Sequence, residues 1–218
     1  MNTAEILTAM RADQVPEGES GLWRIHRRES KVVAPHRTFL EHPRLTDRMM
    51  VPPGRYTFLT RLTTQTLHSG GETVMEDTPQ ELSKHLDFVL RAHGRVLVTG
   101  LGLGCIARGL LLNERVTELH IVEREKAILK LVAPQFAGNS RIRIHHASAI
   151  RWLKKDRSRW DCAWHDLWSD PDREEPHLAI IHQQLMLGLV GRCQMQGAWA
   201  FPRYVRRLLN GYNCCQFI

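Results

Sequence analysis

The fold of this 218-residue chain is decided by one stretch, Val96-Leu97-Val98-Thr99-Gly100-Leu101-Gly102-Leu103-Gly104. Its first four residues form a short apolar run that predicts a buried strand, and residues 105–112 behind it have a helical pattern. Three glycines at alternate positions fill the turn between the two elements. Glycine lets a backbone approach a ligand closely, and the first turn of a helix offers free N–H groups. The stretch therefore predicts a strand, a ligand-binding turn and a helix in that order.

Apolar runs and helical runs alternate along the rest of the chain. Strands predicted at 118–122, 142–145 and 161–165 alternate with helices predicted at 126–132 and 149–155, and a helix at 176–190 and a last strand at 197–201 follow. Strands that are brief apolar runs indicate a parallel sheet covered by helices on both faces. The chain is therefore predicted to be an α/β protein, a three-layer sandwich around a mostly parallel sheet.

The N-terminal part has weaker patterns. Thr78, Pro79 and Glu81 have the spacing of a capping box, which predicts the start of a helix that runs to about Arg91. Short strands are predicted at 56–62, 65–68 and 72–75, and residues 1–50 are predicted to be an irregular arm with a short helix at 4–11. We expect residues 1–77 to form an extension and residues 78–218 to form the main domain.

Composition narrows the class of protein. With 43% hydrophobic and 24% charged residues, the chain is expected to be globular, which excludes disordered and fibrous classes. It has no apolar run of about 18 residues and no signal-peptide pattern at its start, so a cytoplasmic location without membrane association is expected. Its five cysteines are odd in number and lack CxxC spacing, which favours reduced thiols and no metal site.

The net charge of +7 is unevenly distributed. Residues 21–61 and 176–218 are basic, whereas residues 62–175 carry sixteen basic and sixteen acidic side chains. A basic flank is typical of proteins that bind nucleic acid, although a solvated surface has the same composition. The arginines that would contact phosphates are Arg24, Arg27, Arg28, Arg203, Arg206 and Arg207.

Glu123 ends the second strand of the α/β pattern, 21 residues after Gly102. An acid at the carboxyl end of that strand is placed to accept both ribose hydroxyls of a nucleoside held over the glycine turn. The alternative is a surface glutamate that caps the following helix. We favour the nucleoside because predicted strands lie on both sides of the turn.

Residues 72–171 resemble the class I S-adenosylmethionine-dependent methyltransferase superfamily, and within it the spermidine-synthase-like branch. The matching segments are Glu81-Leu-Ser-Lys-His85, the glycine loop, Glu123, Ser148-Ala149 in the place of the family's adenine-contacting Asp-Ala, and Trp160-Asp-Cys-Ala-Trp-His-Asp166. The resemblance implies a Rossmann-like fold that binds S-adenosylmethionine. The cofactor-binding positions that it implies are His85, Gly100, Leu101, Gly102, Gly104, Glu123, Arg124, Ser148, Ala149 and Asp166.

Three departures from that branch bear on the reaction. The acid that holds the cosubstrate's amine in aminopropyltransferases is Leu103 here, and the adenine-contacting acid is Ser148. The loop that begins at Asp166 is one residue longer and contains Trp168. A polyamine needs carboxylates around it, so we favour methyl transfer to a small-molecule or nucleic-acid acceptor. Aminopropyl transfer and a non-catalytic nucleoside- or nucleic-acid-binding module are the alternatives.

Asp166 is the candidate catalytic residue, as a base or a substrate-orienting group, because it follows the fourth strand of the pattern. Its alternative role is that of a cap for the next loop, and His85 has the alternative role of a buried interface histidine. Only 52 residues follow Asp166, so the C-terminal end is predicted to be shortened. The exposed sheet edge would then be covered by the N-terminal arm or by the second subunit of a homodimer.

Overall fold

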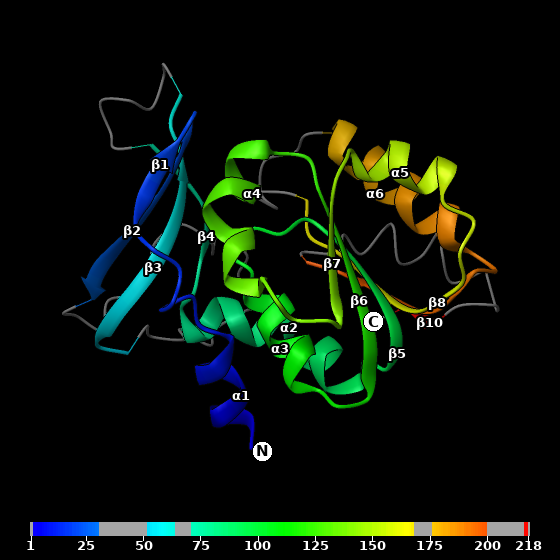
Figure 1. Ribbon diagram of the computed structural model, residues 1–218, viewed down its shortest axis with the longest axis horizontal. Coiled ribbons are helices and arrows are strands. Elements are labelled where there is room, and N and C mark those ends of the chain that lie inside the picture. Colours follow the sequence, from blue (N-terminus) through cyan, green and yellow to red (C-terminus); the bar gives the residue numbers. More distant parts are fainter. Residues whose placement is uncertain (1, 31–51, 64–70, 168–175, 200–215, 218) are drawn as a thin grey trace, which may run out of the picture.

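A parallel sheet forms the centre of the computed structural model, which describes residues 2–30, 52–63, 71–167, 176–199 and 216–217 (Figure 1). Its strand order is β10-β9-β8-β5-β6-β7, and every described pair is parallel. The strands are β5 (Gly94–Thr99), β6 (Val116–Glu123), β7 (Ile142–His146), β8 (Trp160–His165), β9 (Cys193–Ala198) and β10 (Gln216–Phe217). The order reverses between β5 and β8, and ligands bind at such a switch point in open α/β sheets.

Helices cover both faces of this sheet, as the alternating pattern predicts. One face carries α2 (Pro79–Arg91), α3 (Cys105–Leu112) and α4 (Lys126–Val132), followed by a 3₁₀ turn at Ala133–Phe136, and the other carries α5 (Ala149–Lys155) and α6 (Pro176–Leu189). The three helices predicted at 105–112, 126–132 and 149–155 are confirmed at the same bounds. The predicted three-layer, Rossmann-like α/β fold is therefore confirmed.

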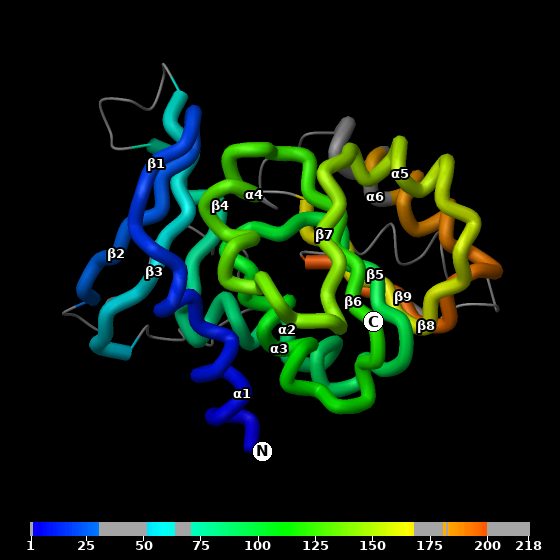
Figure 2. The backbone as a smooth tube through the Cα atoms, viewed as in Figure 1, coloured from blue at the N-terminus to red at the C-terminus, as the bar shows by residue number. Residues whose placement is uncertain are grey.

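A second, smaller sheet precedes the main one in the chain. It is antiparallel, with the order β1-β2-β3-β4, and consists of β1 (Gly18–Ser20), β2 (Trp23–Ser30), β3 (Gly54–Arg61) and β4 (Glu72–Glu76). Helix α1 (Thr3–Met10) precedes it and packs against α2 and α3 (Figure 2). Helix α4 lies between the two sheets, in contact with β1 and β2 on one side and β6 on the other (Figure 1).

The prediction of an irregular arm over residues 1–50 is wrong at β1 and β2. Strand β2 has the sequence WRIHRRES, in which charged residues conceal the alternation of Trp23 and Ile25 with polar neighbours. Eight residue pairs with β3 stabilise this strand, and such tertiary pairing is invisible in a local pattern. The helix predicted at 4–11 is confirmed by α1, and the strand predicted at 65–68 lies outside the described residues.

The C-terminal end also differs from its prediction. The last main strand is β9 at Cys193–Ala198 instead of 197–201, because Gln196 is buried inside the strand and hydrogen-bonds within the core. Strand β10 pairs with β9, so two C-terminal residues of the same chain, and not the N-terminal arm, lie along that edge. The homodimer stays a prediction. No helix within the described ranges is both long and apolar enough to span a bilayer.

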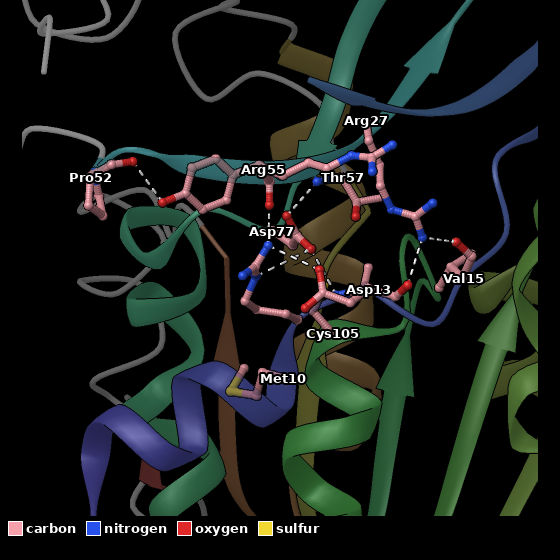
Figure 3. A network of polar contacts seen from close by, with 12 residues as sticks. Met10, Asp13, Val15, Arg27, Pro52, Arg55, Thr57, Asp77 and Cys105 are labelled. Atoms are coloured by element: carbon pink, nitrogen blue, oxygen red, sulfur yellow. Dashed lines mark hydrogen bonds and ion pairs between the residues drawn. The ribbon is translucent and has the colours of Figure 1, made fainter. Parts of the chain in front are cut away.

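Asp77 joins the small sheet to the main unit (Figure 3). Its side chain is fully buried and accepts hydrogen bonds from the backbone N–H of Thr57 at 2.6 Å and of Ala12 at 2.9 Å. The Arg11 guanidinium lies 3.9 Å from the same carboxylate. One buried acid thus connects β3, the segment after α1 and the start of α2, which fixes the N-terminal extension against the helices that carry the site.

Candidate functional site

The glycine loop is shaped by its contacts with the rest of the protein. Gly100, Gly102 and Gly104 have φ angles of 97°, 49° and 77°, which L side chains rarely adopt. A Cβ at Gly100 would lie 1.9 Å from the Asp166 carbonyl oxygen, and a Cβ at Gly102 would lie 2.4 Å from the Sδ of Met75. Internal packing therefore requires these glycines, in addition to any ligand that approaches the loop.

Backbone amides of the loop are bonded to neighbouring elements. The N–H of Leu101 donates to the Oε2 of Glu123 at 2.8 Å, and the N–H of Gly100 donates to the Val122 carbonyl at 2.9 Å. The N–H of Leu103 donates to the Sδ of Met75 at 3.2 Å, which connects the loop to the small sheet. The loop is therefore fixed from β6 on one side and from β4 on the other.

Glu123 lies at the carboxyl end of β6 and is only 6% exposed. Besides the Leu101 amide, its carboxylate accepts the N–H of Glu125 at 2.6 Å, at the start of α4. Burial raises the pKa of this carboxyl, and the hydrogen bonds from backbone amides oppose the rise. The backbone amide of Arg124 also favours the charged form, so three of the roughly four lone-pair sites of the carboxylate face amides and about one remains for a further donor. Glu123 is therefore not the surface helix cap of the alternative, because its side chain is buried and α4, whose N-cap residue is Glu125, has no side-chain cap.

Asp166 follows β8 directly across the switch point from the glycine loop. Its N–H donates to the Thr99 carbonyl at 2.8 Å, which places it beside the end of β5. Burial raises the pKa of its carboxyl to about 7, the negative charges of Glu81 and Glu123 add to the rise, and Lys84 opposes it. The structure therefore brings Asp166 near Glu123 at the carboxyl ends of the central strands, as predicted for both residues.

Helix α2 contributes a charged pair, Glu81 and Lys84, near Asp166. Thr78 caps the helix by accepting the Glu81 N–H at 3.3 Å, and Lys84 donates to the Glu81 carboxylate at 2.6 Å. The Lys84 ammonium also lies 5.0 Å from the centre of the Trp199 ring, just beyond β9. Sequence reasoning missed Lys84 as a site residue, although its spacing of three from Glu81 is the signal that could have found it.

His85 lies under the site, on the inner side of α2. It is fully buried with its ring 5.5 Å from that of Trp164, and burial lowers its pKa to about 3. Neither ring nitrogen has a hydrogen-bond partner within the described part of the chain. The imidazole is therefore neutral and packed in the core, and its predicted contact with a cofactor stays a prediction.

The remaining predicted positions lie at the end of β7 and after β6. Ser148 is the N-cap residue of α5, and the neighbouring Ala147 N–H donates to the Glu123 carbonyl at 3.0 Å. Ala149 is buried, whereas Arg124 is exposed and pairs with Glu125. The turn that carries Ser148 and Ala149 thus adjoins the end of β6, and Arg124 lies at its rim.

A series of hydrogen bonds between buried polar side chains connects the strands below Asp166. The Thr99 hydroxyl lies 2.9 Å from the Nδ1 of His165, whose Nε2 lies 3.4 Å from the Gln196 side-chain oxygen. Burial lowers the pKa of His165 to about 4, so the imidazole is neutral. This series joins β5, β8 and β9 just before their carboxyl ends, so the residues above it stand on a rigid base.

Neither a family model nor a curated protein matches the chain. Among solved structures it is similar to spermidine synthase from Thermotoga maritima, at 17% identity and a TM-score of 0.41, over 79% of this chain and 52% of that one. It is also similar to a provisionally assigned SAM-dependent methyltransferase from Streptococcus mutans, at 10% identity and a TM-score of 0.45, over 72% and 44%. The chain thus spans about half the length of these structures. At such identities the likeness is one of fold.

Proposed function

We propose that the chain is an S-adenosylmethionine-dependent methyltransferase. The observation that carries the proposal is the position of the Glu123 carboxylate, which is bonded to the glycine loop and keeps acceptor capacity opposite Asp166. Class I methyltransferases, which the sequence resembles, bind the nucleoside of their cofactor at this end of the sheet. The fold supplies the scaffold, and these carboxylates supply the chemistry.

The residues at the site fit this cofactor. The remaining acceptor capacity of the Glu123 carboxylate would hold ribose hydroxyls, and the turn at Ser148 and Ala149 would lie against the adenine. The cofactor carries a sulfonium and an ammonium group, and the carboxylates of Asp166 and Glu81 would attract these positive charges. Lys84 limits the excess of negative charge by pairing with Glu81.

Asp166 would act on the methyl acceptor. When bound, S-adenosylmethionine supplies an electrophilic methyl group, and the protein needs mainly to align the acceptor with it. A carboxyl with a pKa of about 7 is half ionised near neutral pH, which suits a general base. Asp166 would therefore take the proton that a nitrogen or oxygen acceptor loses as the new bond to carbon forms.

Aminopropyl transfer is the second candidate function, since the neighbouring carboxyl groups of Asp166 and Glu81 would attract the positive charge of an amine. Two features oppose it. Position 103 is a fully buried leucine and therefore offers no acid to the ligand. The ammonium of Lys84, which is paired with Glu81, would repel a polyamine at the carboxylates. The balance of charge therefore favours methyl transfer.

A nucleic acid is the acceptor class that one further observation favours. Arg28 is exposed and lies over the Phe58 ring at 5.5 Å, and His26 stacks on the same ring, a combination used to bind bases and phosphates. Arg27 instead donates to the carbonyls of Asp13 and Val15, in the segment between α1 and β1. Arg203, Arg206 and Arg207 lie outside the described residues. An affinity that falls steeply with salt would support this acceptor, and salt-insensitive binding would remove it.

Calorimetric titration of the full chain tests the proposed cofactor. We expect S-adenosylmethionine and S-adenosylhomocysteine to bind, and decarboxylated S-adenosylmethionine to bind more weakly. Gly102→Asp should abolish binding, whereas Gly138→Asp should not, because Gly138 also has a positive φ but nothing within 4 Å of its Cβ position. Preference for the decarboxylated compound would indicate an aminopropyltransferase. Binding of none of the three would leave a non-catalytic module on this fold.

A further inference from the structure

The small sheet places a thioether on the glycine loop. Met75 belongs to β4, and its Sδ accepts the N–H of Leu103 at 3.2 Å. The same sulfur lies 2.4 Å from the position that a Cβ of Gly102 would take. The space that the middle glycine leaves open is therefore filled by a side chain of this protein.

A strand irregularity directs Met75 to this position. Strand β4 pairs with β3 at Met75 and Leu59, and then the register shifts, so that Thr60 pairs with Thr73. This β-bulge leaves Val74 without an opposite residue, and bulges commonly redirect a side chain next to an active site. Two residues beyond Met75, the buried Asp77 anchors the strand. The backbone at Met75 is thus held from both sides, whereas its side chain has three rotatable bonds.

A ligand at the loop would compete with this contact. A thioether is a weak hydrogen-bond acceptor, so the Leu103 N–H would gain a stronger partner in a carboxylate or hydroxyl oxygen. The side chain of Met75 is only partly buried, and it packs at the margin of the main core. Its rotation away from the loop would therefore disturb little of the packing and would open the face of Gly102.

We propose that Met75 closes the glycine loop and must be displaced when the nucleoside cofactor binds. This inference rests on the proposed function. It makes the N-terminal sheet part of the binding site, because β4 supplies the residue that closes the loop. The affinity of the protein for the cofactor is then lower than that of a protein with an open loop, since part of the binding energy is used to displace the thioether.

Two variants and one control test this closure, with S-adenosylhomocysteine as the probe in calorimetry. Met75→Ala should bind about fivefold more tightly than the wild type, the change expected when one competing internal hydrogen bond is lost. Met75→Leu, which keeps the volume but loses the acceptor, should lie between them. The control is Met10→Leu, another thioether beside a glycine, Gly109, in α3, and it should leave affinity unchanged. Unchanged or weaker binding by Met75→Ala would overturn the proposal.

Amide hydrogen exchange gives a readout that does not depend on the ligand. Both Met75 variants should speed exchange at the Leu103 N–H relative to the Leu101 N–H, which remains bonded to Glu123. Equal exchange in the wild type and both variants would contradict closure by Met75. If no variant binds the probe while exchange changes as expected, the proposed function fails and the closing contact stands.

Discussion

At the scale of single residues, the two carboxylates of the site differ in their surroundings. Backbone amides, those of Glu125, Leu101 and Arg124, favour the charged form of Glu123 against the effect of burial. Asp166 has a pKa raised to about 7 by burial and by neighbouring acids. One acid is therefore suited to hold hydroxyl donors, and the other is suited to exchange a proton near neutral pH.

Removal of the Glu123 charge should weaken both the fold and the binding of the cofactor. Glu123→Gln keeps one acceptor but turns its amide group toward a backbone donor, so we expect a loss of stability of about 1–3 kcal/mol and a loss of affinity for S-adenosylhomocysteine of tenfold or more. Thermal unfolding and calorimetry measure the two effects. Glu125→Gln, two residues away and paired with Arg124, is the matched control. Equal affinity in both variants would refute the ribose role.

The raised pKa of Asp166 predicts that the stability of the protein depends on pH. Its folded pKa of about 7 lies above the ordinary value of 3.8, so its neutral form stabilises the fold fully below pH 3.8, and this contribution is lost as pH rises through about 7. As the pH rises from 5 to 8.5, the free energy of unfolding of Asp166→Asn should therefore increase by about 1–3 kcal/mol relative to that of the wild type. Asp87→Asn, on the exposed side of α2, should keep the wild-type profile. Parallel profiles for all three proteins would contradict a raised pKa.

The site residues that the sequence could predict are those that end strands. Gly102, Glu123 and Asp166 follow short apolar runs, and parallel strands bring their carboxyl ends to one edge. Met75 and Lys84 could not be found in this way. Met75 reaches the loop through a bulge in another sheet, and Lys84 approaches the site from a helix whose orientation depends on packing.

At the scale of elements, Asp77 holds the small sheet to α2 (Figure 3). Asp77→Asn would leave one of its buried backbone donors, the N–H of Thr57 or of Ala12, facing an amide group. We expect a loss of about 2–4 kcal/mol in the free energy of unfolding, measured by denaturant titration. Asp87→Asn should lose less than about 1 kcal/mol, because Asp87 is exposed and its ion pair with Arg91 lies at the surface. A similar cost for both would contradict the anchoring role.

Elements were predictable where local pattern and tertiary packing agree. The three helices around the glycine loop and Glu123 have apolar periodicity and short turns, so their bounds follow from the sequence. Strand β2 is stabilised by its pairing with β3, and β9 contains the buried Gln196. Polar residues therefore interrupt the apolar pattern that would identify either strand. A single-sequence pattern carries no information on such partners.

At the scale of the whole molecule, one hydrophobic core joins the extension to the main unit. Ile6, Met10, Ile25 and Leu59 belong to the same buried cluster as residues of α2, α3 and β5. We expect a single cooperative unfolding transition, with equal calorimetric and van't Hoff enthalpies. Two separate transitions would show that residues 1–77 and 78–218 fold as independent domains.

The central claim is that the carboxyl ends of β5, β6 and β8 hold a nucleoside cofactor. The most direct measurement is a crystal structure of the protein with S-adenosylhomocysteine. We predict that its ribose hydroxyls lie within hydrogen-bonding distance of the Glu123 carboxylate, with the adenine against Ser148 and Ala149. A ligand bound elsewhere, or a complex in which Glu123 touches no part of it, would contradict the account.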